Sequence, residues 1–150
     1  MYIVNRHKFS SVKKISAKKL VVKSLLSDTH HEMVLEMEVN IDSFQIEKIN
    51  VQVLRAPFEL CFGETDRMQQ LVGIRVKKGI YKEVQKLLGG IKGCTHLVDL
   101  TMEGVNAIIQ AGFRLQGRSL SVNEKNIMFK ENFGLELKKA CHTYDKLIEE

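Results

Sequence analysis

One stretch of alternating residues constrains the fold of this chain more than any other feature. Apolar side chains occupy every second position from Met33 to Ile41, and most of the residues between them are acidic or Asn. Successive side chains of a β-strand point to opposite faces of the sheet. The alternation therefore predicts a strand over 32–41 with one buried face and one solvent-exposed face.

Neighbouring segments predict further strands of the same sheet. These segments are 2–14, 19–27 and 44–54. Asp42-Ser43 suits a tight turn between two of the strands. In the last segment the apolar phase slips at Glu47-Lys48, which indicates a β-bulge that restores a continuous apolar face. The first third of the chain is expected to be an antiparallel sheet of three or four strands.

Beyond Pro57 the spacing of the apolar residues becomes helical. The predicted helices cover 61–72, 80–88, 95–112 and 134–149, with a short helix near 123–130. Gly73, Gly89-Gly90 and Gly112 are expected to end the first three. Strands followed by helices indicate a single α+β domain over 1–150, mainly β over 1–54 and mainly helical over 58–150. Its helices are expected to pack on one face of the sheet.

The positive charge of the chain is concentrated at its beginning. Residues 1–24 contain seven Lys or Arg and no acid, whereas the whole chain has 23 Lys+Arg and 18 Asp+Glu. Because these bases lie in or between predicted strands, we expect them on the solvent-exposed sheet face or guarding an edge strand. Nucleic-acid binding through this segment is the least favoured function, since only Tyr2 and Phe9 supply interleaved aromatic rings.

Other counts favour a cytoplasmic protein. No stretch approaches the roughly 18–20 apolar residues of a membrane span, and the N-terminus lacks the apolar core of a signal peptide. The three cysteines are widely spaced and odd in number, which favours reduced thiols over a disulfide framework.

Four segments carry residue types that can support chemistry. The first, Asp28-Thr29-His30-His31-Glu32, places metal-ligating or acid/base side chains at a strand start, although a polar turn with surface histidines would look the same. The second is Cys61 at a predicted helix start, where the helix dipole favours a thiolate. A small residue on a buried stripe is its structural alternative.

The third segment, 89–97, joins two predicted helices and is rich in glycine. It contains Cys94 and His96, which in a regular helix would point about 200° apart. They can reach one ion only if Cys94 lies in the preceding turn; otherwise this is a plain loop-to-helix junction. The fourth segment contains Cys141 and Tyr144 on one apolar helix face, which packing alone explains.

These segments together resemble an uncharacterised bacterial domain family. The matching elements are His31-Glu32-Met33, Pro57…Cys61, Gly93-Cys94-Thr95-His96-Leu97 and Cys141-His142-Thr143-Tyr144. The resemblance covers nearly the whole chain, and it implies a shared design without a settled activity.

A more distant resemblance is to the iron–sulfur cluster scaffold (NifU/IscU-like) family, over roughly 30–112. In that fold a sheet precedes the helices, and the ligands come from a strand start and two helix starts. Thr29-His30-His31-Glu32, Cys61 and Cys94 fall at these places. The resemblance implies that His31 (or His30), Glu32, Cys61 and Cys94 converge on one site with His96 nearby. Such a set would suit zinc, iron or an iron–sulfur cluster.

Two functions from different classes follow from this predicted site. One is a metal-binding protein of the scaffold type. The other is a small metal- or thiol-dependent enzyme, with Cys61 or Cys94 as thiolate and His31 or His96 as base. The substrate, the partner and the oligomeric state are not encoded in any motif of the chain.

Overall fold

The computed structural model describes residues 1–116, 121, 123–124 and 127. The chain divides into two compact units, Met1–Ala111 and Gly112–Glu150, and the first contains the whole sheet. The predicted helix over 134–149, with Cys141 and Tyr144, lies outside the described residues. The single domain over 1–150 stays a prediction.

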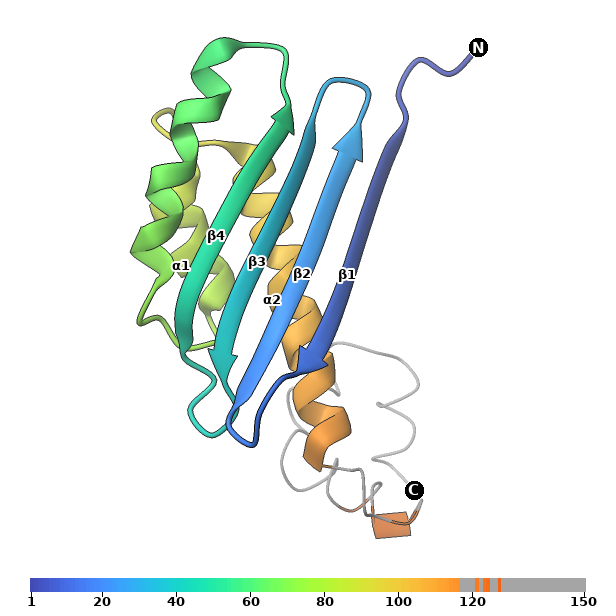
Figure 1. Cartoon of the computed structure of the whole chain (residues 1–150), viewed down its shortest axis with the longest axis vertical. Coiled ribbons are helices and arrows are strands. Elements are labelled where there is room, and N and C mark those ends of the chain that lie inside the picture. Colours follow the sequence, from blue (N-terminus) through green and yellow to red (C-terminus); the bar gives the residue numbers. More distant parts are fainter. Residues whose placement is uncertain (117–120, 122, 125–126, 128–150) are drawn as a thin grey trace. The chain divides into compact units, whose positions relative to one another are not determined.

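Four antiparallel strands form one sheet in the order in which they occur along the chain (Figure 1). The strands are β1 (Arg6–Lys14), β2 (Lys19–Asp28), β3 (Glu32–Asn40) and β4 (Ile46–Arg55). Each strand pairs with the next, so β1 is an edge strand. The predicted α+β class is therefore confirmed. The likeness to the NifU/IscU-like fold stays a prediction.

In the part of the chain that the structure describes, three named helical elements follow the sheet. They are η1 (Glu59–Leu71), α1 (Ile80–Leu88) and α2 (Thr95–Gln116). The first is a 3-10 helix where the spacing predicted an ordinary helical stripe, and it begins at Glu59, two residues before the predicted start. The third continues past Gly112, where we expected it to end. Among the described residues, no helix has the length and apolar character needed to cross a membrane.

The core lies between one face of the sheet and the helical elements that cover it, η1, α1 and α2 (Figure 1). Met33, Leu35, Met37 and Val39 of β3 are all buried, as the alternation predicts. From α2, the buried apolar side chains are Leu97, Val98, Leu100, Val105 and Ile108.

The predicted bulge in β4 is confirmed. Glu38 pairs with Lys48, while the next residue of β3, Val39, pairs with Ile46. Glu47 is therefore the extra residue. The bulge lets Ile46 and Ile49, which are three positions apart, both be buried on the same face.

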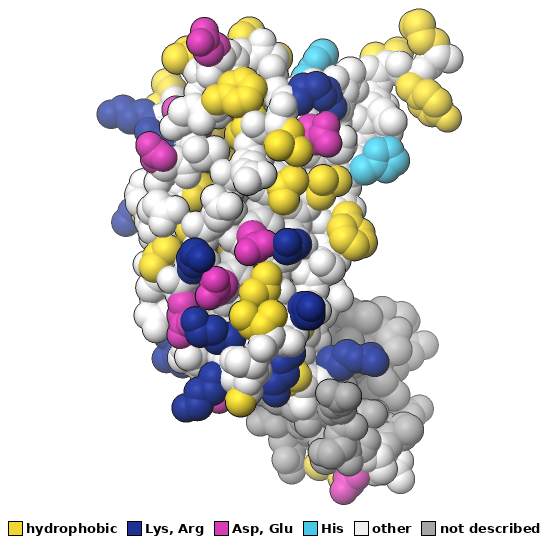
Figure 2. Space-filling view, in the orientation of Figure 1, with side chains coloured by type: hydrophobic (Ala, Val, Ile, Leu, Met, Phe, Trp, Pro, Cys, Tyr) yellow, Lys and Arg dark blue, Asp and Glu magenta, His cyan; other side chains and the backbone are white. Residues whose placement is uncertain are grey.

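The opposite face of the sheet is exposed and carries charged pairs. Figure 2 looks onto this face and shows Lys, Arg, Asp and Glu side chains interspersed over its lower part. Lys23 of β2 contacts Glu36 of the neighbouring β3 at 2.9 Å. Lys19 of β2 contacts Glu47 of β4 at 3.1 Å, across the end of β3. The basic N-terminal segment therefore meets acids of the same chain.

Two bases of the edge strand β1 contact α2 as well as solvent. Arg6 forms an ion pair with Asp99 of α2, and Lys8 lies 3.1 Å from the same carboxylate. Lys8 also lies 3.9 Å from Glu103. These contacts join the edge strand to the first half of α2.

Because one face of β3 is buried and the other is exposed, substitutions on the two faces should change the free energy of unfolding by different amounts. Leu35 is 0% exposed, so Leu35→Ala should lower the free energy of unfolding by about 2–5 kcal/mol through lost burial and a cavity. Glu36→Gln on the exposed face removes only the pair with Lys23 and should cost less than about 1 kcal/mol. Urea denaturation of the full chain measures both. Equal losses would contradict the assignment of the faces.

Candidate metal centre

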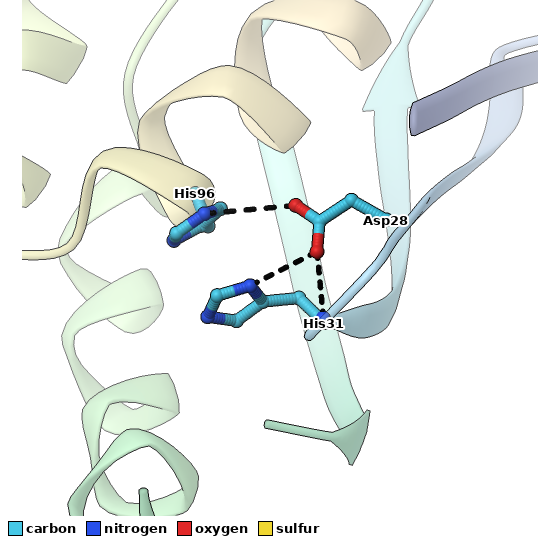
Figure 3. Close-up of side chains that lie close together, drawn as sticks. All are labelled: Asp28, His31 and His96. Carbon is cyan, nitrogen blue, oxygen red and sulfur yellow. Dashed lines mark hydrogen bonds and ion pairs between the residues drawn. The ribbon is translucent and has the colours of Figure 1, made fainter. Parts of the chain in front are cut away.

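Three side chains from two distant parts of the sequence converge at one end of the sheet (Figure 3). Asp28 is the last residue of β2, and His31 lies in the turn that leads to β3. His96 lies in the first turn of α2. Because α2 packs beneath the sheet, its first turn meets the β2–β3 connection.

The three residues offer ligand atoms at distances that suit one metal ion. These atoms all lie within 4.8 Å of one another. His31 Nδ1 lies 3.1 Å from Asp28 Oδ1, and His96 Nε2 lies 3.8 Å from Asp28 Oδ2. Two ligands of a tetrahedral zinc ion are roughly 3.4 Å apart, given Zn–N and Zn–O lengths near 2.1 Å. The two spacings measured from the Asp28 carboxylate bracket this value.

The imidazole rings of His31 and His96 stack on each other. Their centroids are 3.7 Å apart and their planes differ by 28°. Burial lowers the pKa of His96, and the neighbouring His31 lowers it further. A neutral His96 keeps a lone pair on one ring nitrogen, which is the form that binds a metal. For His31 and His96 to hold one ion together, their rings would have to leave this stacked arrangement.

The carboxylate of Asp28 organises the turn that carries His31. Its Oδ1 accepts hydrogen bonds from the backbone N–H groups of His30 at 2.9 Å and His31 at 2.7 Å. Burial alone would raise the pKa of Asp28, but these bonds and the His31 imidazole outweigh it and lower the pKa to about 2. Asp28 is therefore an anion throughout the neutral range.

Cys94 lies in the turn before α2. The sequence spacing predicted that only this position would let Cys94 and His96 reach one ion. Its N–H donates to the Leu88 carbonyl at 2.7 Å, and its carbonyl accepts from Val98. Its Sγ lies 4.0 Å from His96 Nδ1. The thiol therefore faces the ring nitrogen opposite the one that faces Asp28, and it is not one of the three converging ligands.

The other predicted ligands that the structure describes lie outside this converging group. Glu32 begins β3, where the strand alternation turns it away from the buried Met33, and its carboxylate lies 4.0 Å from Arg55. Cys61 is half-buried in η1, beside β4. The backbone of His30 donates to Asp28, while the residue itself is exposed.

Asp28 was named within the first candidate segment, but it was not carried into the predicted ligand set. It stands three residues before His31, within the segment that was singled out, and a carboxylate is an ordinary ligand for zinc or iron. Its role depends on where β2 ends and how the following turn folds back, which the sequence pattern did not specify.

Comparison with known proteins finds a match to a family model. A family model described as "Protein of unknown function (DUF2889)" matches residues 10–110. The matched span includes Asp28, His31 and His96. No curated protein and no solved structure matches the chain.

The turn before α2 predicts a second stability contrast. A Cβ at Gly93 would overlap the carbonyl oxygens of Leu88 and Gly89, so Gly93→Ala should displace this turn and destabilise the fold by on the order of 2 kcal/mol. It should also remove the NMR cross-peaks between the His31 and His96 rings, because α2 begins directly after the turn.

Gly63→Ala is the matched control. A Cβ at Gly63 meets no atom within 4 Å, so this variant should keep both the stability and the ring cross-peaks. Retention of the cross-peaks in Gly93→Ala would show that the turn does not position His96.

Proposed function

The chain belongs to the DUF2889 family of unknown function, and from its geometry we propose that it binds one transition-metal ion, zinc or iron, through Asp28, His31 and His96. The observation that carries this proposal is the convergence of two imidazoles and one carboxylate from β2, the following turn and α2.

The chemistry of the three ligands supports a mononuclear site. Two histidines with one carboxylate are a ligand set that proteins use for catalytic zinc and for non-haem iron(II). An iron–sulfur cluster takes cysteine thiolates, and the converging set contains none. We therefore favour a single ion over the scaffold-type role that the distant resemblance implies.

The incomplete ligand set supports a site that is open to further ligands. Structural zinc sites have four protein ligands, whereas catalytic sites have three and leave a position for water or substrate. The side chain of His96 is 27% exposed, while those of His31 and Asp28 are 13% and 11% exposed. An additional ligand would thus reach the ion from the side of His96.

Metal titration of the full chain, purified without a histidine tag, tests this function. We expect one equivalent of Zn²⁺ or Fe²⁺ per chain by calorimetry or chelator competition. His31→Ala and His96→Ala each remove a ligand, so they should weaken binding by more than the roughly 10–100-fold that outer-shell changes cause.

The control is His30→Ala, which removes the neighbouring exposed imidazole but keeps the backbone N–H that Asp28 accepts. It should bind metal like the wild type. Binding far below one equivalent in the wild type, or an equal loss in His30→Ala, would contradict the proposed site.

One further observation favours a thiol-dependent enzyme as the second candidate function. Cys94, His96 and Asp28 stand in the order of a nucleophile, a base and an orienting carboxylate, at 4.0 Å and 3.8 Å. Cys61 is also half-buried and serves as an internal reference.

Alkylation by iodoacetamide, followed by mass spectrometry at neutral pH, tests this alternative. Cys94 should react faster than Cys61, and His96→Gln should slow Cys94 alone because the base is lost. Equal rates for the two thiols, unaffected by the substitution, would exclude the thiol mechanism.

A further inference from the structure

The turn between β2 and β3 is held from two sides. On one side, the Asp28 carboxylate accepts the N–H groups of His30 and His31. On the other side, the guanidinium of Arg55 donates hydrogen bonds to the carbonyl groups of the same turn. Its Nη1 donates to the Thr29 carbonyl at 2.7 Å, and its Nη2 donates to the Asp28 carbonyl at 2.8 Å.

A third contact completes this arrangement. Arg55 Nη2 also lies 3.4 Å from the carbonyl oxygen of His31. The guanidinium therefore spans the turn from the residue that supplies the carboxylate to the residue that supplies the first imidazole. Both proposed ligands of this turn have their backbone carbonyl groups bonded to one side chain.

We propose that Arg55 is a positioning residue for the metal site, and that it acts by fixing the backbone of the Asp28–His31 turn. This inference rests on the proposed metal-binding function. Arg55 bonds to no ligand atom of the cluster, so it would act entirely through Asp28 and His31.

The register of β4 places Arg55 beside the turn between β2 and β3. Met33 of β3 pairs with Val53, but Glu32 pairs with Arg55, so Leu54 is the extra residue of a second irregularity. In a regular ladder Leu54 would stand opposite Glu32. Bulges that re-aim a side chain often lie next to functional sites, and this one puts a guanidinium beside the turn.

The chemistry of the contact requires arginine rather than any cation. A guanidinium is a rigid planar fork that can donate to two carbonyl oxygens at once. An ammonium group is a compact point charge and does not reproduce that geometry. Lysine at position 55 should therefore leave the turn less ordered, although it keeps the charge near Glu32.

The expected consequence is weaker metal binding. When the turn samples other conformations, only the fraction with Asp28 and His31 correctly placed can bind, and the apparent affinity falls by that fraction. Arg55→Gln should weaken metal binding roughly 10–100-fold, as is usual for groups that orient ligands. Arg55→Lys should recover only a small part of this loss.

Arg75→Gln is the matched control. Arg75 also donates from its guanidinium to a backbone carbonyl, that of Ser43 at 2.9 Å, but in the connection between β3 and β4. Affinities for Zn²⁺ are measured by chelator competition on the full chain. The visible spectrum of the Co²⁺-loaded protein reports the ligand geometry separately from stability. We expect a changed spectrum in Arg55→Gln and an unchanged spectrum in Arg75→Gln.

The outcomes separate this inference from the function on which it rests. If the wild type binds no metal, both are overturned. If the wild type binds one ion and Arg55→Gln binds it equally well with the same Co²⁺ spectrum, the role of Arg55 is overturned and the metal site stands. Equal losses in the Arg55 and Arg75 variants would also overturn it, because they would reflect a general effect of removing a guanidinium.

Discussion

The carboxylate of Asp28 is the group on which the proposed site depends. One of its oxygens accepts two backbone N–H groups and faces the His31 imidazole, and the other faces His96. The same group therefore shapes the turn and supplies the negative charge between two imidazoles. Hydrogen bonds that outweigh the effect of burial hold its pKa at about 2, so the charge persists at any physiological pH.

The fold brings that carboxylate to His96 through contacts elsewhere in the core. Buried side chains of α2 pack on the inner face of β2 and β3, and Arg6 and Lys8 bind Asp99 one turn beyond His96. These contacts set where α2 begins relative to the end of β2. The basic N-terminal segment, which at first suggests a nucleic-acid partner, thus contributes in part to placing the site.

Much of the fold could be predicted because its determinants are local. Alternation along 32–41 identifies β3 and its buried face, and the slip at Glu47-Lys48 identifies the bulge. Two ligands of the proposed site, His31 and His96, were singled out from residue type and position. Their meeting depends on packing between α2 and the sheet, which no local pattern encodes.

Other features of the proposed site could not be predicted, because they depend on turn geometry and strand register. Asp28 acts through the geometry of a turn, and Arg55 reaches that turn only because Leu54 is an extra residue in the ladder. The spacing predicts that Cys94 and His96 can reach one ion only if Cys94 lies in the turn before α2. Cys94 does lie there, and its sulfur faces the ring nitrogen of His96 opposite the one that faces Asp28.

We propose that two imidazoles and one carboxylate, without sulfur, hold a single ion. X-ray absorption spectroscopy of the zinc-loaded full chain tests it most directly. The account predicts a first shell of nitrogen and oxygen near about 2.0–2.1 Å, with the outer-shell scattering of two imidazole rings. A sulfur scatterer near about 2.3 Å would contradict it, since that distance would assign a cysteine thiolate to the ion.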